Sequence, residues 1–282
     1  MPMVETIHSP FRSRERIMGY GRESGGKSSG LLSIARHCPN DMFYIIDNDN
    51  AYDRLLETDF KDVWANGNVK FAGEDFGKRP LSDWDNAKAC IAWVLENMGR
   101  DDWLSIDFLN KFWSQVQSSF IQKIFGKEMD DYFLQVRLQK ERAEKDSKAL
   151  GAFDGWKDWP VINSMYHSKV SEPLLNCHGH LYVVSESTKI NMPDNQGKGG
   201  DDKATRELYG SVGVRPDGQK RSGHIMQTVI FFSKTTRTNE FKLTTIKDRG
   251  RVMWNDEPFG DFAMDYLVGT AGWEVRKQYV AG

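Results

Sequence analysis

The sequence predicts an α/β protein with a mainly parallel central sheet flanked by helices. A glycine-rich phosphate-binding pattern separates a strand-like segment from a helix-like one, apolar runs alternate with amphipathic stretches, and one run ends in an aspartate. Strands that alternate with helices at this rhythm are joined by right-handed crossovers, which build parallel sheets. We expect the 282 residues to form one domain, with residues 1–15 as an irregular lead-in.

The phosphate-binding pattern is GRESGGKS at residues 21–28, a full match to GxxxxGK[ST]. The segment 16–20 before it is a strand candidate, and apolar residues after it follow helical spacing. Glycines let several backbone N–H groups converge on a phosphate, and the helix directs its N-terminus at the same charge. In this pattern Lys27 reaches the β- and γ-phosphates of ATP, and the Ser28 hydroxyl coordinates Mg²⁺. A surface turn is the alternative. The residues expected to bind the nucleotide are Gly21, Arg22, Glu23, Ser24, Gly25, Gly26, Lys27, Ser28 and Ser29.

A second strand candidate, residues 103–106, ends in Asp107. A buried central strand that delivers one carboxylate to its C-terminal end is typical of the Walker-B strand, which holds the metal through water. The alternative is an aspartate that caps the next helix. We expect Asp107 to be the carboxylate on the metal side.

The residue after Asp107 is Phe108, whereas many ATPases have a water-polarising glutamate there. The catalytic carboxylate must therefore come from elsewhere. The best source is the strand candidate 43–49, which runs into an acidic cluster that includes Asp49 and Asp53. A set of Asx turns with a helix cap is the alternative interpretation of these acids.

Two of these segments resemble the bacterial RecA recombinase and the RecA-like ATPases of many phages. They are the P-loop with Glu23 and Ser24 and the strand end from Ile46 to Asp53. The resemblance, close over residues 14–125 and looser over 178–252, implies a RecA-like P-loop NTPase core. It places the water-activating glutamate of RecA on Asp49 and a residue near the adenine on Asp53. Because aspartate is one methylene shorter than glutamate, we expect slow hydrolysis.

A basic element follows the alternating strand candidate 241–246. Its sequence, Lys247-Asp248-Arg249-Gly250-Arg251, is similar to an element of RadA-like and replicative-helicase ATPases. In those proteins the lysine and arginine of one subunit reach the γ-phosphate held by its neighbour. The resemblance implies a homo-oligomer with shared active sites, in which Lys247 and Arg249 act in trans. A basic β-turn is the alternative.

The strand candidate 179–184 ends in Ser185 and Glu186. The RecA-like architecture places a polar γ-phosphate sensor here, and either residue fits. The long segment 191–223 is rich in Gly, Asp and Lys, so we expect a mobile loop. The resemblance implies DNA binding by this loop, and the alternative is a solvated connector. Its expected contacts with single-stranded DNA are Lys198, Lys203, Lys220 and Arg221.

Other segments complete the expected topology. A short strand is expected over 68–72, and helices over 84–98, with Gly99 as its cap, 112–125 and 161–175. Residues 127–160 form a charged helical insertion, which is either an exposed helix or an arm for subunit contacts. Strands over 224–232 and 241–246 pair through a short turn. The aromatic residues expected to anchor the C-terminal segment by packing are Phe262, Tyr266, Trp273 and Tyr279.

Composition limits the partners and the compartment. A formal net charge of −2 excludes a globally basic nucleic-acid binder, so DNA contact must use a local patch. Three widely spaced cysteines favour a reducing cytosol without disulfides or zinc, and His178 with His180 lack a third metal ligand. No apolar run is long enough to span a bilayer, so we expect a cytoplasmic protein, in the host cytoplasm if a phage encodes it. The local basic patch consists of Arg215, Lys220, Arg221, Lys234, Arg237, Lys242, Lys247, Arg249 and Arg251.

The sequence thus favours a Mg²⁺-dependent ATPase of the RecA-like class that acts on DNA, in phage recombination or replication. One alternative is a DNA-translocating motor of the helicase or packaging type. The other is a P-loop kinase for a small acceptor, an enzyme class that often works as a monomer with a mobile arginine-rich lid.

Overall fold

The computed structural model describes residues 14–73, 83–142, 153–193, 200–235 and 237–268. Its strands are β1 Arg16–Gly21, β2 Phe43–Ile46, β3 Val69–Phe71, β4 Trp103–Ile106, β5 His180–Ser185, β6 Ser187–Lys189, β7 Val214–Pro216, β8 Thr228–Lys234, β9 Phe241–Lys247 and β10 Glu257–Pro258. Its α-helices are α1 Lys27–His37, α2 Ala51–Glu57, α3 Lys61–Asn66, α4 Trp84–Asn97, α5 Leu109–Phe125, α6 Met129–Arg142, α7 Asp158–Tyr166, α8 Glu172–Asn176, α9 Lys203–Tyr209 and α10 Ser222–Ile225. Two π-helical segments are η2 His167–Ser171 and η3 Ala263–Val268.

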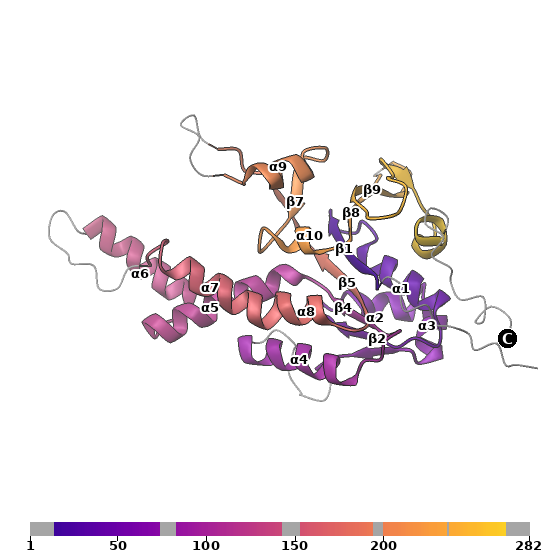
Figure 1. Cartoon of the computed structure of the whole chain (residues 1–282), viewed down its shortest axis with the longest axis horizontal. Helices are drawn as coiled ribbons and strands as arrows, with labels where there is room; N and C mark the ends of the chain where they lie inside the picture. The colour runs from indigo at the N-terminus through magenta and orange to yellow at the C-terminus, as the bar shows by residue number, and fades with distance from the viewer. Residues whose placement is uncertain (1–13, 74–82, 143–152, 194–199, 236, 269–282) are drawn as a thin grey trace, which may run out of the picture.

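Eight strands form one sheet in the order β10-β9-β8-β1-β5-β4-β2-β3 (Figure 1). The six strands from β8 to β3 are parallel, and β9 and β10 add antiparallel pairs at one edge. This arrangement confirms the predicted α/β class with a mainly parallel sheet and antiparallel C-terminal strands. Because β1, β2, β4 and β5 are parallel, their carboxyl ends lie at the same edge of the sheet.

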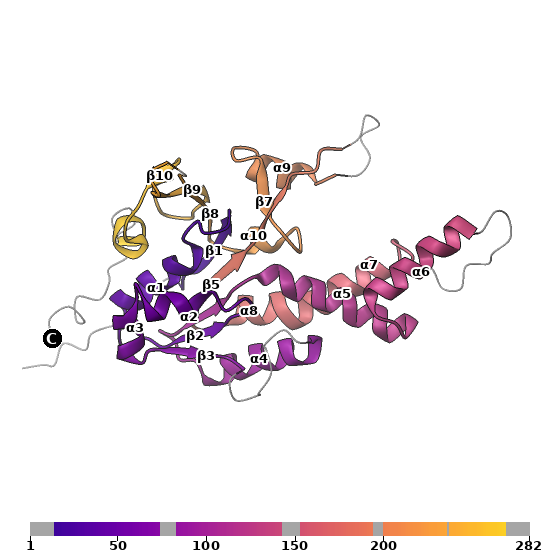
Figure 2. The same cartoon turned by 180° about the vertical axis from the view of Figure 1, so that it is seen from behind.

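Each face of the sheet is covered by helices, as Figure 2 shows from behind. Side chains alternate between the faces along each strand, so that Ile17 and Trp103 belong to one core and Met18 and Leu104 to the other. The first core is closed by α1, α2, α3 and η3, and the second by α4, α5, α7, η2 and α8. Burial on both faces explains why the parallel strands are apolar throughout.

Helices α5, α6 and α7 form an arm that extends away from the sheet (Figures 1 and 2). Tyr132 of α6 is buried and stacks on Phe125 of α5 with their ring centroids 4.3 Å apart. By contrast, Phe133, Leu134 and Leu138 of the same helix are exposed. Within the range 127–160, the described residues contain α6 and the start of α7, and residues 143–152 lie outside the description.

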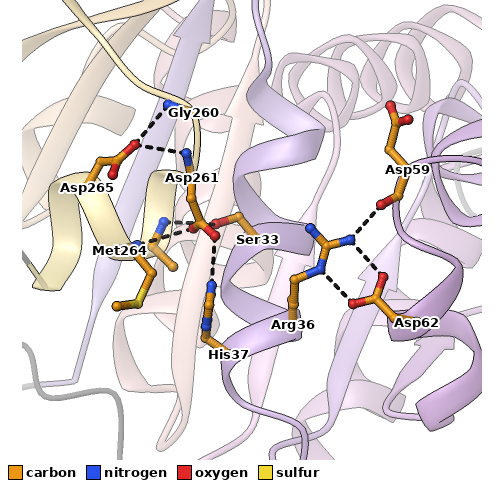
Figure 3. Close-up of polar contacts among 10 residues, drawn as sticks. Ser33, Arg36, His37, Asp59, Asp62, Gly260, Asp261, Met264 and Asp265 are labelled. Atoms are coloured by element: carbon orange, nitrogen blue, oxygen red, sulfur yellow. Dashed lines mark hydrogen bonds and ion pairs between the residues drawn. The ribbon is translucent and has the colours of Figure 1, made fainter. Parts of the chain in front are cut away.

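The helix that follows the P-loop is held by polar contacts on two sides (Figure 3). Ser33 Oγ donates a hydrogen bond of 2.5 Å to Asp261, and His37 Nε2 lies 2.7 Å from the other oxygen of that carboxylate. Burial alone would oppose ionisation, but these contacts lower the pKa of Asp261 to about 2. On the other side Arg36 forms a bidentate pair with Asp62, at 2.6 and 2.7 Å. These contacts tie α1 to η3 and α3, which fixes the position of the P-loop.

Several element boundaries differ from the sequence-based expectation. Strand β2 ends at Ile46, so the acids after it lie in a turn. The helix expected at 161–175 is interrupted by the π-helical segment η2, and the strand expected at 224–232 begins at Thr228 because α10 precedes it. Helix α4 has Met98 as its C-cap in place of Gly99. Among the C-terminal aromatic residues Phe262 and Tyr266 are buried as expected, and Trp273 and Tyr279 lie outside the described residues.

The segment 191–223 was expected to be a loop, but it contains α9, β7 and the start of α10. The cause is a buried carboxylate. Asp201 is 1% exposed, forms ion pairs of 3.0 Å with Arg215 and with Lys220, and accepts a hydrogen bond from the backbone N–H of Asn191. The sequence suggested that these charged side chains are solvated. In the structure they form ion pairs with one another within the segment. Residues 194–199, with Lys198, lie outside the description.

Candidate functional site

The P-loop joins β1 to α1 at the carboxyl edge of the sheet. Its backbone has positive φ angles at Gly21 (+141°), Ser24 (+54°) and Gly26 (+94°). A Cβ atom on Gly21 would lie 2.0 Å from the carbonyl oxygen of Phe232, which also accepts a hydrogen bond from the N–H of Arg22. No side chain fits at Gly21, because β8 lies directly against the loop.

Lys27 begins α1 and lies over the loop. Its ammonium donates hydrogen bonds to the carbonyl oxygens of Arg22 (2.7 Å) and Gly21 (3.4 Å). Burial lowers the pKa of Lys27, and the nearby Asp107 and Asp49 carboxylates oppose this shift. The donors of Lys27 are thus held beside the backbone N–H groups that would cradle a phosphate.

Ser28 of the P-loop and Asp107 after β4 are 79 residues apart in the sequence and meet in the structure. Ser28 Oγ donates a hydrogen bond of 2.9 Å to Asp107 Oδ2. Asp107 follows β4 and is 1% exposed, and its backbone N–H bonds to the carbonyl oxygen of Ile46 at the end of β2. Burial, together with the charge of Asp49, raises the pKa of Asp107 to about 7, although the Ser28 hydrogen bond lowers it.

Three carboxylates gather beside Ser28. One oxygen each of Asp47, Asp49 and Asp107 lies within 4.8 Å of the others. The Asx-turn interpretation is also correct locally, because Asp47 accepts a hydrogen bond from the N–H of Asp49 and Asp49 accepts one from Ala51. Burial raises the pKa of Asp47 to about 6. The turn thus holds two carboxylates facing a third. A bound cation would reduce the repulsion between their negative charges.

The donor set at this point fits Mg²⁺. Hydroxyl and carboxylate oxygens are the hard ligands that this ion prefers, and it is commonly held by one or two carboxylates together with phosphate oxygens. Ser28 and Asp107 are the residues that would hold it. The glycine-rich loop and the N-terminus of α1 would offer backbone N–H groups to phosphates.

A cavity of about 1110 Å³ opens over the P-loop, Asp49 and Asp107. Its volume exceeds that of most small-molecule sites and leaves room for a nucleoside triphosphate. All nine residues 21–29 that the sequence predicts to bind the nucleotide line it, as do Asp49, Asp107 and Glu186. Its other lining residues are Ala51, Arg54, Leu55, Thr58, Asp59, Phe108, Lys111, Ser187, Thr188, Asp217, Lys234 and Phe241.

Glu186, one of the two sensor candidates, faces this cavity from the end of β5. Its carboxylate accepts a hydrogen bond of 2.8 Å from Asn110 Nδ2, which also lies 3.4 Å from Asp217 Oδ2. The other candidate, Ser185, is buried and donates to the carbonyl oxygen of Asp217. Glu186 is therefore the residue of the pair that a bound nucleotide could contact directly.

Three predicted residues are not part of this cavity. Asp53 is exposed on α2 and does not line it. Lys247 donates to the carbonyl oxygens of Met226 and His224, and burial lowers its pKa, so its ammonium is engaged within its own chain. Arg249 is exposed in the turn after β9.

Sequence reasoning missed several lining residues. The face of α2 that lines the cavity consists of Ala51, Arg54 and Leu55 and continues at the C-cap residue Thr58. These positions follow the helical spacing i, i+3, i+4 and i+7. Lys111 lies in the first turn of α5, just beyond Asp107. A search for helical faces that begin at the strand ends could have identified both groups.

Lys203 and the two histidines considered as metal ligands have structural partners. Lys203 pairs with Glu207 at 3.6 Å within α9. His180 Nδ1 accepts a hydrogen bond from the N–H of Glu15, and His178 Nε2 lies 2.7 Å from the carbonyl oxygen of Met98. These histidines support the fold at the amino end of β5.

No protein-family model matches the chain, and comparison with curated proteins finds no match. Among solved structures, the crystal structure of the RadB recombinase aligns with a TM-score of 0.45 and 8% sequence identity, over 84% of this chain and 83% of that one. A similarity this low does not establish a function. Within the described residues no helix is both long and apolar enough to cross a bilayer.

Proposed function

We propose that the chain is a Mg²⁺-dependent ATPase of the RecA-like class that acts on single-stranded DNA. The observation that carries the proposal is the 2.9 Å hydrogen bond from Ser28 Oγ to Asp107 Oδ2 at the mouth of the P-loop, beside Lys27. A P-loop hydroxyl and a carboxylate from the end of another parallel strand are the pair that Mg²⁺–triphosphate binding requires.

The phosphate-binding roles follow from position. The backbone N–H groups of the loop and the ammonium of Lys27 would bind the phosphates, and Ser28 and Asp107 would hold Mg²⁺. When bound, the ion neutralises charge that develops on the β- and γ-phosphates. The residues around it bind and orient the triphosphate and keep solvent away from its inner side.

Asp49 is the proposed carboxylate that orients the attacking water. It is exposed to the cavity, whereas Asp47 and Asp107 are more deeply placed. Glu186 is the proposed γ-phosphate sensor, since Asn110 holds its carboxylate at the cavity wall. A charged hydrogen bond of this kind fixes the sensor in a defined orientation.

Arg249 is the proposed trans-acting residue of a homo-oligomer. Its side chain is exposed, whereas Lys247 is engaged with carbonyl oxygens of its own chain and positions the turn. We assign the cation that reaches a neighbouring γ-phosphate to Arg249. The resemblance to RecA-like ATPases supports a duty in phage recombination or replication.

The test measures phosphate release with and without Mg²⁺ and single-stranded DNA. The account predicts Mg²⁺-dependent hydrolysis that DNA stimulates and that Lys27→Ala abolishes, while the exposed control Lys61→Ala retains it. Hydrolysis by Lys27→Ala at the wild-type rate would reject the proposal. Stimulation of hydrolysis by a small acceptor and not by DNA would favour the kinase alternative.

The shared site has its own test. Arg249→Ala and Asp49→Asn should each be inactive, and equal mixtures should regain activity because about a quarter of head-to-tail interfaces combine both intact residues. Mixtures as inactive as the separate variants would show that Arg249 does not act between subunits.

A further inference from the structure

A second cavity lies beside the nucleotide site. It has a volume of about 1050 Å³ and separates the helices α5, α7 and η2 from the segment 218–225. Trp113 and Trp159 lie on its helical side, and Gln219, Lys220 and Arg221 lie on the other. We name it the aromatic groove.

The helical wall offers flat aromatic surface in a fixed orientation. The rings of Trp113 and Trp159 are nearly parallel, with an interplanar angle of 14° and centroids 6.1 Å apart. Tyr166 meets Trp113 edge-on, and Phe153 meets Trp159 edge-on, so both indoles are held by neighbouring rings. Trp159 is still 39% exposed. An exposed, preoriented indole is a stacking surface for a nucleobase, because every base has a π face.

The opposite wall supplies a cation and amide groups. The Arg221 side chain is exposed, and its guanidinium has no hydrogen-bond or ion-pair partner among the described residues. Lys220, by contrast, is engaged with Asp201. A long hydrogen bond of 3.5 Å, from Gln219 Nε2 to Asn163 Oδ1, links the two walls. Amide groups match the donor and acceptor pattern of base edges, so a base could replace this weak link.

The groove shares two structural elements with the nucleotide cavity. At the start of α5, Lys111 lines the nucleotide cavity and Trp113 lines the groove. The second element is the turn after β7, where Asp217 lines the nucleotide cavity and Gly218 lines the groove. A Cβ atom on Gly218 would lie 2.9 Å from the Cα of Asn110, so the two elements are in direct contact. Occupation of either cavity acts on the same two elements.

We propose that the aromatic groove binds an unpaired base of single-stranded DNA, stacked on Trp159, with its phosphate on Arg221. This inference rests on the proposed function, which it extends by assigning the strand to a particular site. The site differs from the loop and the basic patch that the sequence suggested. Of the three expected loop contacts that the structure describes, Lys220 and Arg221 line the groove, and of these two Lys220 forms an ion pair with Asp201.

The test uses fluorescence anisotropy of a labelled strand of about 20 thymidines, and of the same strand without bases. Trp159→Leu keeps an apolar side chain but removes the flat ring. It should weaken thymidine binding about tenfold, leave abasic binding unchanged, and so erase the difference between the two strands. Trp159→Phe should restore most of that difference. Arg221→Ala should weaken both strands and reduce the salt dependence of binding by about one phosphate contact.

Matched controls are Trp64→Leu, an exposed tryptophan of α3, and Arg100→Ala, an exposed arginine before β4. Neither should change binding, and all variants should bind fluorescent ATP as the wild type does. Wild-type affinity in both Trp159→Leu and Arg221→Ala would overturn the groove and leave the proposed function intact. A wild-type protein that hydrolyses ATP but binds neither strand would overturn the groove together with the DNA part of that function.

Discussion

Replacing Asp107 by Asn should stabilise the protein in the absence of nucleotide and metal while it abolishes hydrolysis. Asp107 is buried beside Asp47 and Asp49, and this environment raises its pKa to about 7. A carboxyl group whose folded-state pKa is raised favours the folded state at low pH, and that contribution is lost as the pH rises. The side chain in the Asp107→Asn variant does not ionise, so the variant does not lose stability through this position as the pH rises.

The magnitude follows from the shift. The change from 3.8 to about 7 is about 3 units, and each unit corresponds to about 1.4 kcal/mol, so the cost of ionising Asp107 approaches about 4 kcal/mol. Stability of the wild type should therefore decline relative to the variant between about pH 4 and about pH 7, and the gap should be constant above that range. At about 2 °C per kcal/mol for a chain of this size, the gap in Tm approaches about 8 °C.

The assay is urea denaturation and thermal melting of both proteins across this pH range, in EDTA. Asp53→Asn, on the exposed side of α2, is the matched control and should show no such pH-dependent gain. Saturating Mg²⁺ with ATP should stabilise the wild type more than Asp107→Asn. A variant equally or less stable than the wild type at about pH 8, with the control unchanged, would refute the electrostatic reasoning.

Two further perturbations test other parts of the account. Arg251→Ala removes a guanidinium that bonds Glu15 at 2.6 and 3.1 Å with both side chains buried, so it should cost about 3–5 kcal/mol in urea denaturation. The exposed Arg36→Ala should cost less than about 1 kcal/mol, and an equal loss in both would contradict this. Gly21→Ala places a Cβ 2.0 Å from the Phe232 carbonyl oxygen, so fluorescent ATP should no longer bind. Affinity within about twofold of the wild type would show that the loop tolerates a side chain there.

The site residues that could be predicted from the sequence are those that closely follow the end of a strand. An apolar run followed by an acid, next to a P-loop, is enough to place Asp107 and Asp49 at one sheet edge, because parallel strands end together. That expectation needs no knowledge of side-chain packing. The structure confirms the mainly parallel sheet and brings these acids beside Ser28.

The sequence could not predict the positions of residues that are set by contacts between distant segments or by the direction in which a helical face points. Lys247 is engaged because carbonyl oxygens of residues 223–226 surround its ammonium. The segment 191–223 folds because Asp201 finds Arg215 and Lys220, charges that composition alone suggests are solvated. Asp53 lies away from the cavity because α2 begins at Ala51, which sets the face that lines it.

The most direct test of the central claim is a structure determined with Mg²⁺ and a non-hydrolysable ATP analogue. The account predicts the triphosphate along the backbone of residues 21–28, Lys27 at its terminal phosphates, and the ion bound by Ser28 with Asp107 beside it. A triphosphate bound elsewhere, or an ion remote from Ser28 and Asp107, would contradict it.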